Sequence, residues 1–350
     1  MPIFGTEGIG IDIGTTQTSI FLNSEDEVAL REPTSVLVNG ENMQEVLAVG
    51  QEARSMLGRT ARELELISPV QLGAVADVDM TALLMVALAE KATGRKRPME
   101  KATLVAGLSG GATKVERAAL FQAMNATGAK RVAALRTPVA AAIGADLDIS
   151  KPRGTMIVSL GGGCTEIAVL SMNSIVALRK IFFGGQDLDE AIVRWFWRKK
   201  KVVIGMRTAE QLKREVGTVC EEDAGEDEEP VLLKGKNALT GAPASVQVSP
   251  RDIMQALDEP VQRIVDALRN ALYNTPPELS ADIRDRGLFI TGGGALLNGL
   301  DRRLARETGL TIHMSRHPQD DAVIGLGAAA ANDRLLSALI RASAAEATGD

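Results

Sequence analysis

The stretch "MIVSLGGGCTEIAVLS", Met156 to Ser171, decides the fold of this chain. An apolar strand leads into three consecutive glycines, and a second apolar strand leads out. Glycine turns present backbone N–H groups without side-chain obstruction, and phosphate oxygens need many donors in a small space. The stretch therefore predicts a hairpin whose turn faces a phosphate.

Two further stretches repeat this pattern. Residues 8–22, "GIGIDIGTTQTSIFL", predict strand, tight turn and strand, and residues 286–300, "RGLFITGGGALLNGL", predict a strand followed by a triple glycine. One such turn is common and has a structural explanation, whereas three in order favour a shared ligand. The two hairpin-like turns, near Gly14 and Gly162, also predict two related halves.

Composition limits the classes of function. The chain has 350 residues with a formal net charge of −6 and 3% aromatic residues, which argues against a sequence-blind nucleic-acid binder, and we expect no nucleic-acid partner. Its two cysteines, Cys164 and Cys220, form neither a zinc pattern nor a disulfide framework. A reducing cytoplasm is the simplest location.

The motifs resemble those of the actin, Hsp70 and sugar-kinase superfamily. "DIGT" (12–15) is similar to the first phosphate motif, "LGGGCTEIAV" to the second and "ITGGGALLNGLD" to the adenosine motif. Within that superfamily the chain resembles the MreB-type bacterial actins, from about residue 8 to residue 330. Further matching segments include "EVLAVGQEARSMLGRT", "PVAAAIGADL", "GGQDLDEAIV" and "TAEQLKREVG".

The resemblance implies an α/β, actin-like fold with two similar RNase H-like domains and a nucleotide cleft between them. Residues 1–150 would form the first domain, with a small subdomain at about 33–70. Residues 151–350 would form the second, with a small subdomain at about 186–255.

The resemblance also implies a binding site for ATP or GTP with Mg²⁺. Asp12 stands at a strand end beside a phosphate turn, where a carboxylate can hold the water shell of Mg²⁺. The implied nucleotide-binding residues are Asp12, Gly14, Thr15, Thr16, Gly161, Gly162, Gly163, Lys213, Glu215, Gly292, Gly293 and Gly294.

The sequence departs from the family pattern in three places, which comprise four residues, and all would lie near the γ-phosphate. Ser159 stands where the second phosphate motif normally begins with Asp, and Cys164 stands where Thr usually follows the three glycines. Arg136-Thr137 replaces a Glu pair, one member of which positions the attacking water. Losing such an acid costs on the order of 10²–10⁴ in rate. We therefore expect nucleotide binding with weak hydrolysis, and Arg136 either meets phosphate or points to solvent.

The resemblance implies a cytoskeletal protein that assembles head to tail into paired filaments for cell shape or spatial organisation. The alternative is a non-polymerising nucleotide-binding adaptor that regulates a true MreB filament. A sugar kinase is less consistent with the sequence, because we find neither a substrate-binding insertion nor a catalytic base.

A membrane surface and other cytoskeletal proteins are further candidate partners. In MreB-type actins a loop at this position often inserts into the bilayer. Here that loop carries Arg95, Lys96 and Arg97, which favours at most an electrostatic contact with anionic lipid. The N-terminal Ile3 and Phe4 offer a small apolar anchor.

Overall fold

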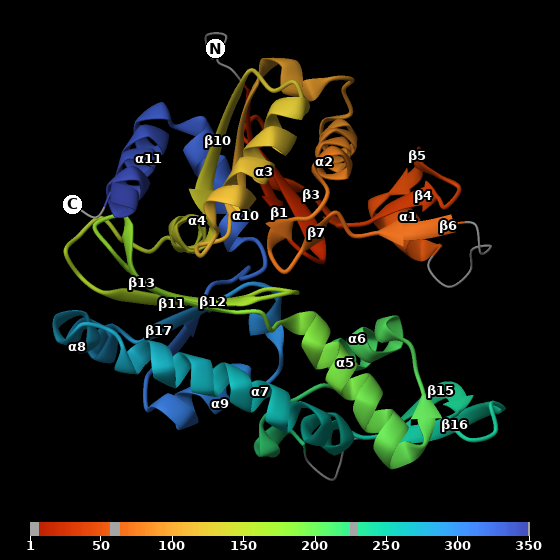
Figure 1. Cartoon of the computed structure of the whole chain (residues 1–350). Helices are drawn as coiled ribbons and strands as arrows, with labels where there is room; N and C mark the ends of the chain where they lie inside the picture. Colours follow the sequence, from red (N-terminus) through yellow and green to blue (C-terminus); the bar gives the residue numbers. More distant parts are fainter. Residues whose placement is uncertain (1–6, 57–63, 225–229, 349–350) are drawn as a thin grey trace.

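A computed structural model describes residues 7–56, 64–224 and 230–348 of the chain. Two halves stand one above the other, and each is built on a five-stranded sheet (Figure 1). The prediction of an α/β fold with two similar halves is therefore confirmed at the level of the sheets.

The first sheet has the strand order β10-β9-β1-β2-β3. The strand β1 pairs antiparallel with β2, which pairs antiparallel with β3, while β9 runs parallel to both β1 and β10. The bounds are β1 (Glu7–Ile13), β2 (Gln17–Leu22), β3 (Glu27–Pro33), β9 (Ala102–Leu108) and β10 (Arg131–Arg136).

The second sheet repeats this arrangement in the order β13-β12-β11-β17-β18. Here β11, β12 and β13 are antiparallel neighbours, and β17 runs parallel to both β11 and β18. The bounds are β11 (Thr155–Leu160), β12 (Thr165–Ser171), β13 (Ser174–Ile181), β17 (Leu288–Thr291) and β18 (Ile312–Met314).

Helices cover both faces of both sheets. The helices are α2 (Val78–Thr93), α3 (Lys114–Ala126), α4 (Thr137–Gly144), α5 (Gly185–Trp195), α6 (Met206–Glu215), α7 (Pro250–Tyr273), α8 (Pro277–Arg286), α9 (Leu300–Thr308), α10 (Asp321–Ala331) and α11 (Asp333–Thr348). Because side chains alternate along a strand, Met156 and Val158 of β11 pack towards α5, α7 and α9, while Ile157 packs towards α4 and α10. The helices α2 and α3 cover the outer face of the first sheet.

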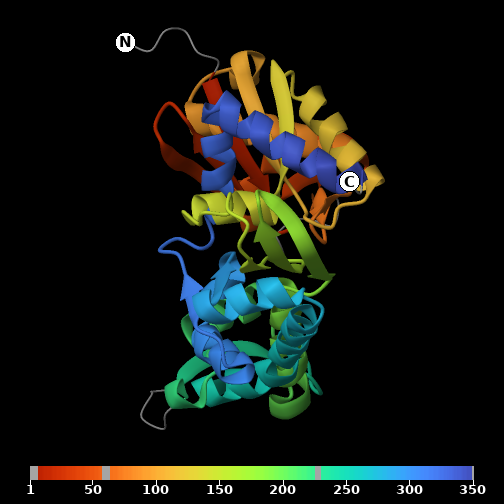
Figure 2. The same cartoon turned by 90° about the vertical axis from the view of Figure 1, so that its left-hand side faces the viewer.

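The helices α4 and α10 fill the space between the two sheets. Close approach of α10 to β1 requires glycine, because a Cβ at Gly10 would lie 2.5 Å from the backbone nitrogen of Gly327. Arg31 of β3 holds the start of α10 through two hydrogen bonds to Asp320, at 2.6 and 2.7 Å. The helix α10 therefore returns to the first half, and α11 follows it (Figure 2) and also contacts β13 of the second sheet, although the sequence-based division had placed residues 151–350 in the second half.

Each half also carries a small sheet. The first comprises β5 (Asn42–Val49), β4 (Val36–Asn39) and β6 (Leu64–Ile67) beside α1 (Gly50–Ser55). The second comprises β14 (Val202–Val203), β15 (Val231–Asn237) and β16 (Pro243–Val248). A two-stranded ribbon, β7 (Val70–Gln71) and β8 (Ala74–Val75), lies between the first small sheet and α2 along the chain.

The structure describes some of the residues considered for membrane contact, and that contact stays a prediction. Arg95 pairs with Glu7 at 3.2 Å and Arg97 with Glu100 at 3.3 Å, so part of the basic charge of their loop is balanced. Ile3 and Phe4 lie outside the described residues. In the part of the chain that the structure describes, no single helix is long and apolar enough to cross a bilayer; only α10 and α11 together, bent by 114°, meet that criterion.

Candidate functional site

The first two glycine turns face each other across the two halves. A Cβ at Gly163 would lie 2.7 Å from Oγ1 of Thr15, and a Cβ at Gly162 would collide with the side chain of Thr16. Glycine in the second turn thus allows the threonines of the first to approach its backbone. The structure brings together Gly14, Thr15 and Thr16 with Gly161, Gly162 and Gly163, as the resemblance implied.

The turns present unused backbone donors. Among the described residues, none accepts a hydrogen bond from the N–H of Thr15, Thr16, Gly162 or Gly163. Thr15 and Gly163 are nevertheless buried. Buried peptide N–H groups are nearly always paired, so a group of such donors in two facing turns fits an anionic ligand such as phosphate.

An acidic corner lies beside the turns. Asp12 is the penultimate residue of β1, and burial together with the charge of Glu166 raises the pKa of its carboxyl to about 6. Glu166 is buried on β12 and accepts hydrogen bonds from Oγ of Ser109 at 2.6 Å and from N of Gly111 at 3.3 Å. A divalent cation would relieve the repulsion between the two carboxylates, and Mg²⁺ is usually held by one or two carboxylates plus phosphate oxygens. These residues therefore fit the expected metal.

The departing residues lie at this same corner. A Cβ at Gly107 would be 2.8 Å from Oδ1 of Asp12 and 3.4 Å from Oγ1 of Thr137, which places Thr137 next to Asp12. Ser159 pairs across the hairpin with Glu166. Burial, reinforced by the charge of Glu166, raises the pKa of the Cys164 thiol to about 11, so this group is protonated at neutral pH. Neither Thr137 nor Cys164 supplies a base.

Arg136 does not point freely into solvent. Its side chain is half buried, and its Nη1 donates a hydrogen bond to the carbonyl oxygen of Gly110, in the loop after β9. A structural role in fixing that loop follows from this contact.

The residues expected near the adenosine are less closely grouped. A Cβ at Gly292 would lie 2.6 Å from the carbonyl oxygen of Leu160, and a Cβ at Gly294 would lie 2.8 Å from the Cβ of Leu160. The third turn therefore packs against the second hairpin. Lys213 of α6 donates to the carbonyl of Gly185 at 2.8 Å and pairs with Asp189 at 2.7 Å. Glu215 is exposed and accepts from Gln211. Among the described residues, Glu215 makes no hydrogen bond or ion pair with the turns, and its nucleotide role stays a prediction.

Comparison with known proteins identifies the family. The protein-family model described as "MreB/Mbl protein" matches residues 6–338 of the chain. The chain belongs to the MreB/Mbl family. It is thus an actin-like cytoskeletal protein, and the family and fold predicted from its motifs are confirmed.

Two similar proteins match this chain over most of both lengths. The cell shape-determining protein Mbl of Bacillus subtilis (strain 168) is 40% identical over 319 residues, 91% of this chain and 94% of that protein. The cell shape-determining protein MreB of Escherichia coli (strain K12) is 36% identical over 313 residues, 89% of each.

Solved structures agree with the fold. MreB5 of Spiroplasma citri bound to AMPPNP superposes with a TM-score of 0.84 at 26% identity, covering 92% of this chain and 95% of that one. The same protein bound to ADP also has a TM-score of 0.84. The MamK double helical filament, at 19% identity, has a TM-score of 0.75 over 93% of this chain and 98% of that one, and supports the fold alone.

Sequence reasoning missed four polar residues that join the halves. Glu166 could have been found by counting across the predicted hairpin from Ser159. Lys180 of β13 donates to Oγ of Ser109 at 2.9 Å, and Arg54 of α1 pairs with Glu210 of α6. No sequence signal points to these two contacts, because they join residues 71 and 156 positions apart.

Proposed function

We propose that this MreB/Mbl chain is a cytoskeletal actin that binds ATP or GTP, with Mg²⁺, between the two facing turns. The unused N–H groups of Thr15, Thr16, Gly162 and Gly163 carry this proposal. They would hold the phosphates from both sides, so that one ligand links the two halves. The AMPPNP and ADP bound to MreB5 support nucleotide as that ligand.

Asp12, with Glu166 beside it, would hold the Mg²⁺ water shell, and the metal would balance phosphate charge. The chain's own residues would bind and orient the phosphates but would not efficiently activate water. Thr137 has no carboxylate, Ser159 has no charge, and the thiol of Cys164 stays protonated. Hydrolysis would therefore be slow, because phosphoryl transfer depends on positioned water and balanced charge.

We further propose head-to-tail, paired assembly in the cytoplasm, since a heterologous contact that does not close generates an open polymer. The cell shape-determining relatives support this role. Contact with a membrane surface or with other cytoskeletal proteins stays a prediction. A chain that binds nucleotide and another actin but does not pellet would instead fit the adaptor.

Direct titration with nucleotide tests the site. Mg-ATP and Mg-ADP added to the purified full chain should each give saturable heat and raise the melting temperature, because ligand binding to the native state stabilises it. Failure of both ATP and GTP, titrated in the same way, to bind at millimolar concentration would overturn the proposed function.

A further inference from the structure

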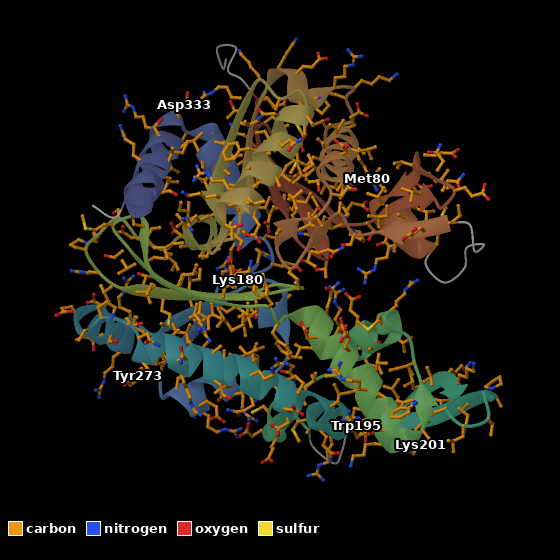
Figure 3. The ribbon with its side chains drawn as sticks, viewed as in Figure 1. Met80, Lys180, Trp195, Lys201, Tyr273 and Asp333 are labelled. Atoms are coloured by element: carbon orange, nitrogen blue, oxygen red, sulfur yellow. The ribbon has the colours of Figure 1, made fainter. Side chains whose placement is uncertain are left out.

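The side chain of Lys180 reaches from the second half to the first, beside Ser109. Lys180 lies near the end of β13, and its Nζ donates to Oγ of Ser109, which directly follows β9 of the first sheet. Figure 3 shows Lys180 where the two halves meet. The ammonium group of Lys180 therefore connects the two halves.

The ammonium group lies beside both phosphate turns. A Cβ at Gly73 would be 3.0 Å from Sγ of Cys164 and 3.6 Å from Nζ of Lys180. The N–H of the same Gly73 donates to Oγ1 of Thr15 at 2.9 Å. Gly73 thus lies against Thr15 of the first turn, Cys164 of the second, and Lys180.

Lys180 retains donors for an anion. An ammonium group has three N–H donors, and one is used by the hydroxyl of Ser109. The half-buried side chain also places Nζ 5.0 Å from the centre of the Phe182 ring. A cavity beside Ser109 is lined in part by Gly73, Gly107 and Glu116, and the charge of Lys180 acts on the Glu116 carboxylate.

Charge is separated across this end of the site. Ser109 accepts from Lys180 and donates to Glu166, whose charge acts on Asp12. Both charges therefore reach the hydroxyl of Ser109, where the carboxylates attract a cation and the ammonium attracts an anion. A phosphoryl group with its metal has the matching arrangement of charge.

We propose that Lys180 binds the terminal phosphoryl group, either as the γ-phosphate of a bound nucleotide or as free phosphate. The inference rests on the proposed nucleotide site and adds to it a means of distinguishing triphosphate from diphosphate. A γ-phosphate would draw Lys180 and β13 onto a ligand that both turns hold. A diphosphate would leave Lys180 on Ser109.

The test compares Lys180→Met with the wild-type chain and with Lys234→Met, a control on the exposed face of β15. Affinities for ADP, for AMPPNP and for ADP with inorganic phosphate would be measured by titration, all with Mg²⁺. Losing one charge-assisted hydrogen bond should weaken AMPPNP binding roughly 10- to 100-fold. Affinity for ADP should be unchanged, and Lys180→Arg should restore most of the AMPPNP affinity.

The titration of ADP with inorganic phosphate distinguishes free phosphate from the γ-phosphate of a bound nucleotide. Phosphate that raises ADP affinity in the wild type but not in Lys180→Met identifies free phosphate as a ligand; an effect on AMPPNP alone restricts the site to bound γ-phosphate. An equal change for ADP and AMPPNP, or none in either, overturns the inference while leaving the proposed function standing. If Lys180→Met fails to fold, Lys180→Gln, which keeps a long polar side chain but removes the charge, decides by the same comparison of AMPPNP with ADP. Absence of any nucleotide binding by the wild type would overturn both proposals.

Discussion

The two hairpins that face each other have the same backbone and opposite placement of charge. Asp12 pairs with Ser19 across the first, and Ser159 pairs with Glu166 across the second, at matching positions of the register. The turn bonds also match, from N of Gly14 to O of Gln17 at 2.9 Å and from N of Gly161 to O of Cys164 at 3.0 Å. In the first hairpin the acid lies on the strand before the turn and the serine on the strand after it, and in the second hairpin the order is reversed.

The buried threonines that follow the turns complete the likeness. Thr18 bonds Thr34 at 2.9 Å, and Thr165 donates to the carbonyl of Phe183 at 2.8 Å, so each ties its hairpin to the segment that follows the next strand. Phosphate-binding geometry therefore depends on backbone that both hairpins share. Catalytic charge depends on side chains, which differ between them, so binding and hydrolysis are separable here.

The largest expected effect comes from restoring an acid beside Asp12. In Thr137→Glu, phosphate release should rise roughly 10²-fold or more, within the 10²–10⁴ typical of general acid–base assistance. Thr137→Gln, which lacks the carboxylate, should give no gain. Phosphate release measured under single turnover checks this, and an unchanged rate in Thr137→Glu would show that the missing acid does not limit hydrolysis.

Removing the acid of the first hairpin should stabilise the chain without ligand. The carboxyl of Asp12 has its pKa raised to about 6 from 3.8, so its ionisation disfavours the folded state at neutral pH. Asp12→Asn should raise the free energy of unfolding by about 3 kcal/mol above pH 7, and this gain should disappear as the pH falls from about 6 to 4. Mg-nucleotide binding should weaken in the same variant.

Denaturant unfolding across this pH range checks the sign. The exposed Asp26→Asn is the matched control and should give no such profile. A destabilised or pH-independent Asp12→Asn would contradict the assigned environment of Asp12.

Adding a methyl group to the second turn should disturb the backbone that the hairpins share. In Gly162→Ala the new Cβ meets the side chain of Thr16 and should push the turns apart, at about 1–3 kcal/mol, or roughly 10- to 100-fold in nucleotide affinity. Gly205→Ala has open space at its Cβ and serves as the control. Equal nucleotide affinities for the two variants would argue against facing turns.

The smallest expected effect concerns the ion pair between α1 and α6, which joins the two halves. Arg54 and Glu210 are partly exposed, with 32% and 24% of their side chains accessible, and such pairs contribute roughly 0.2–1 kcal/mol. Arg54→Ala, Glu210→Ala and the double variant should show a coupling in nucleotide dissociation rate of at most about fivefold, reduced by salt. Strict additivity would mean that the pair does not hold the halves together.

The sequence was sufficient to predict the glycine turns and hairpins, because β-branched runs and glycines are local signals. It could not show that α10 packs on the first half, since helical periodicity does not specify which sheet a helix covers. Lys180 and Arg136 were unpredictable for a related reason: a long basic side chain has no local pattern that states its distant partner. Glu166 was within reach, because hairpin register places it opposite Ser159.

The most direct test of separable binding and hydrolysis is phosphate release measured beside pelleting, with ATP and with AMPPNP. The account predicts that the wild-type chain pellets with both nucleotides while releasing little phosphate as filaments form. Rapid phosphate release during assembly with ATP would contradict it, because other residues would then perform the catalysis that Thr137, Ser159 and Cys164 cannot.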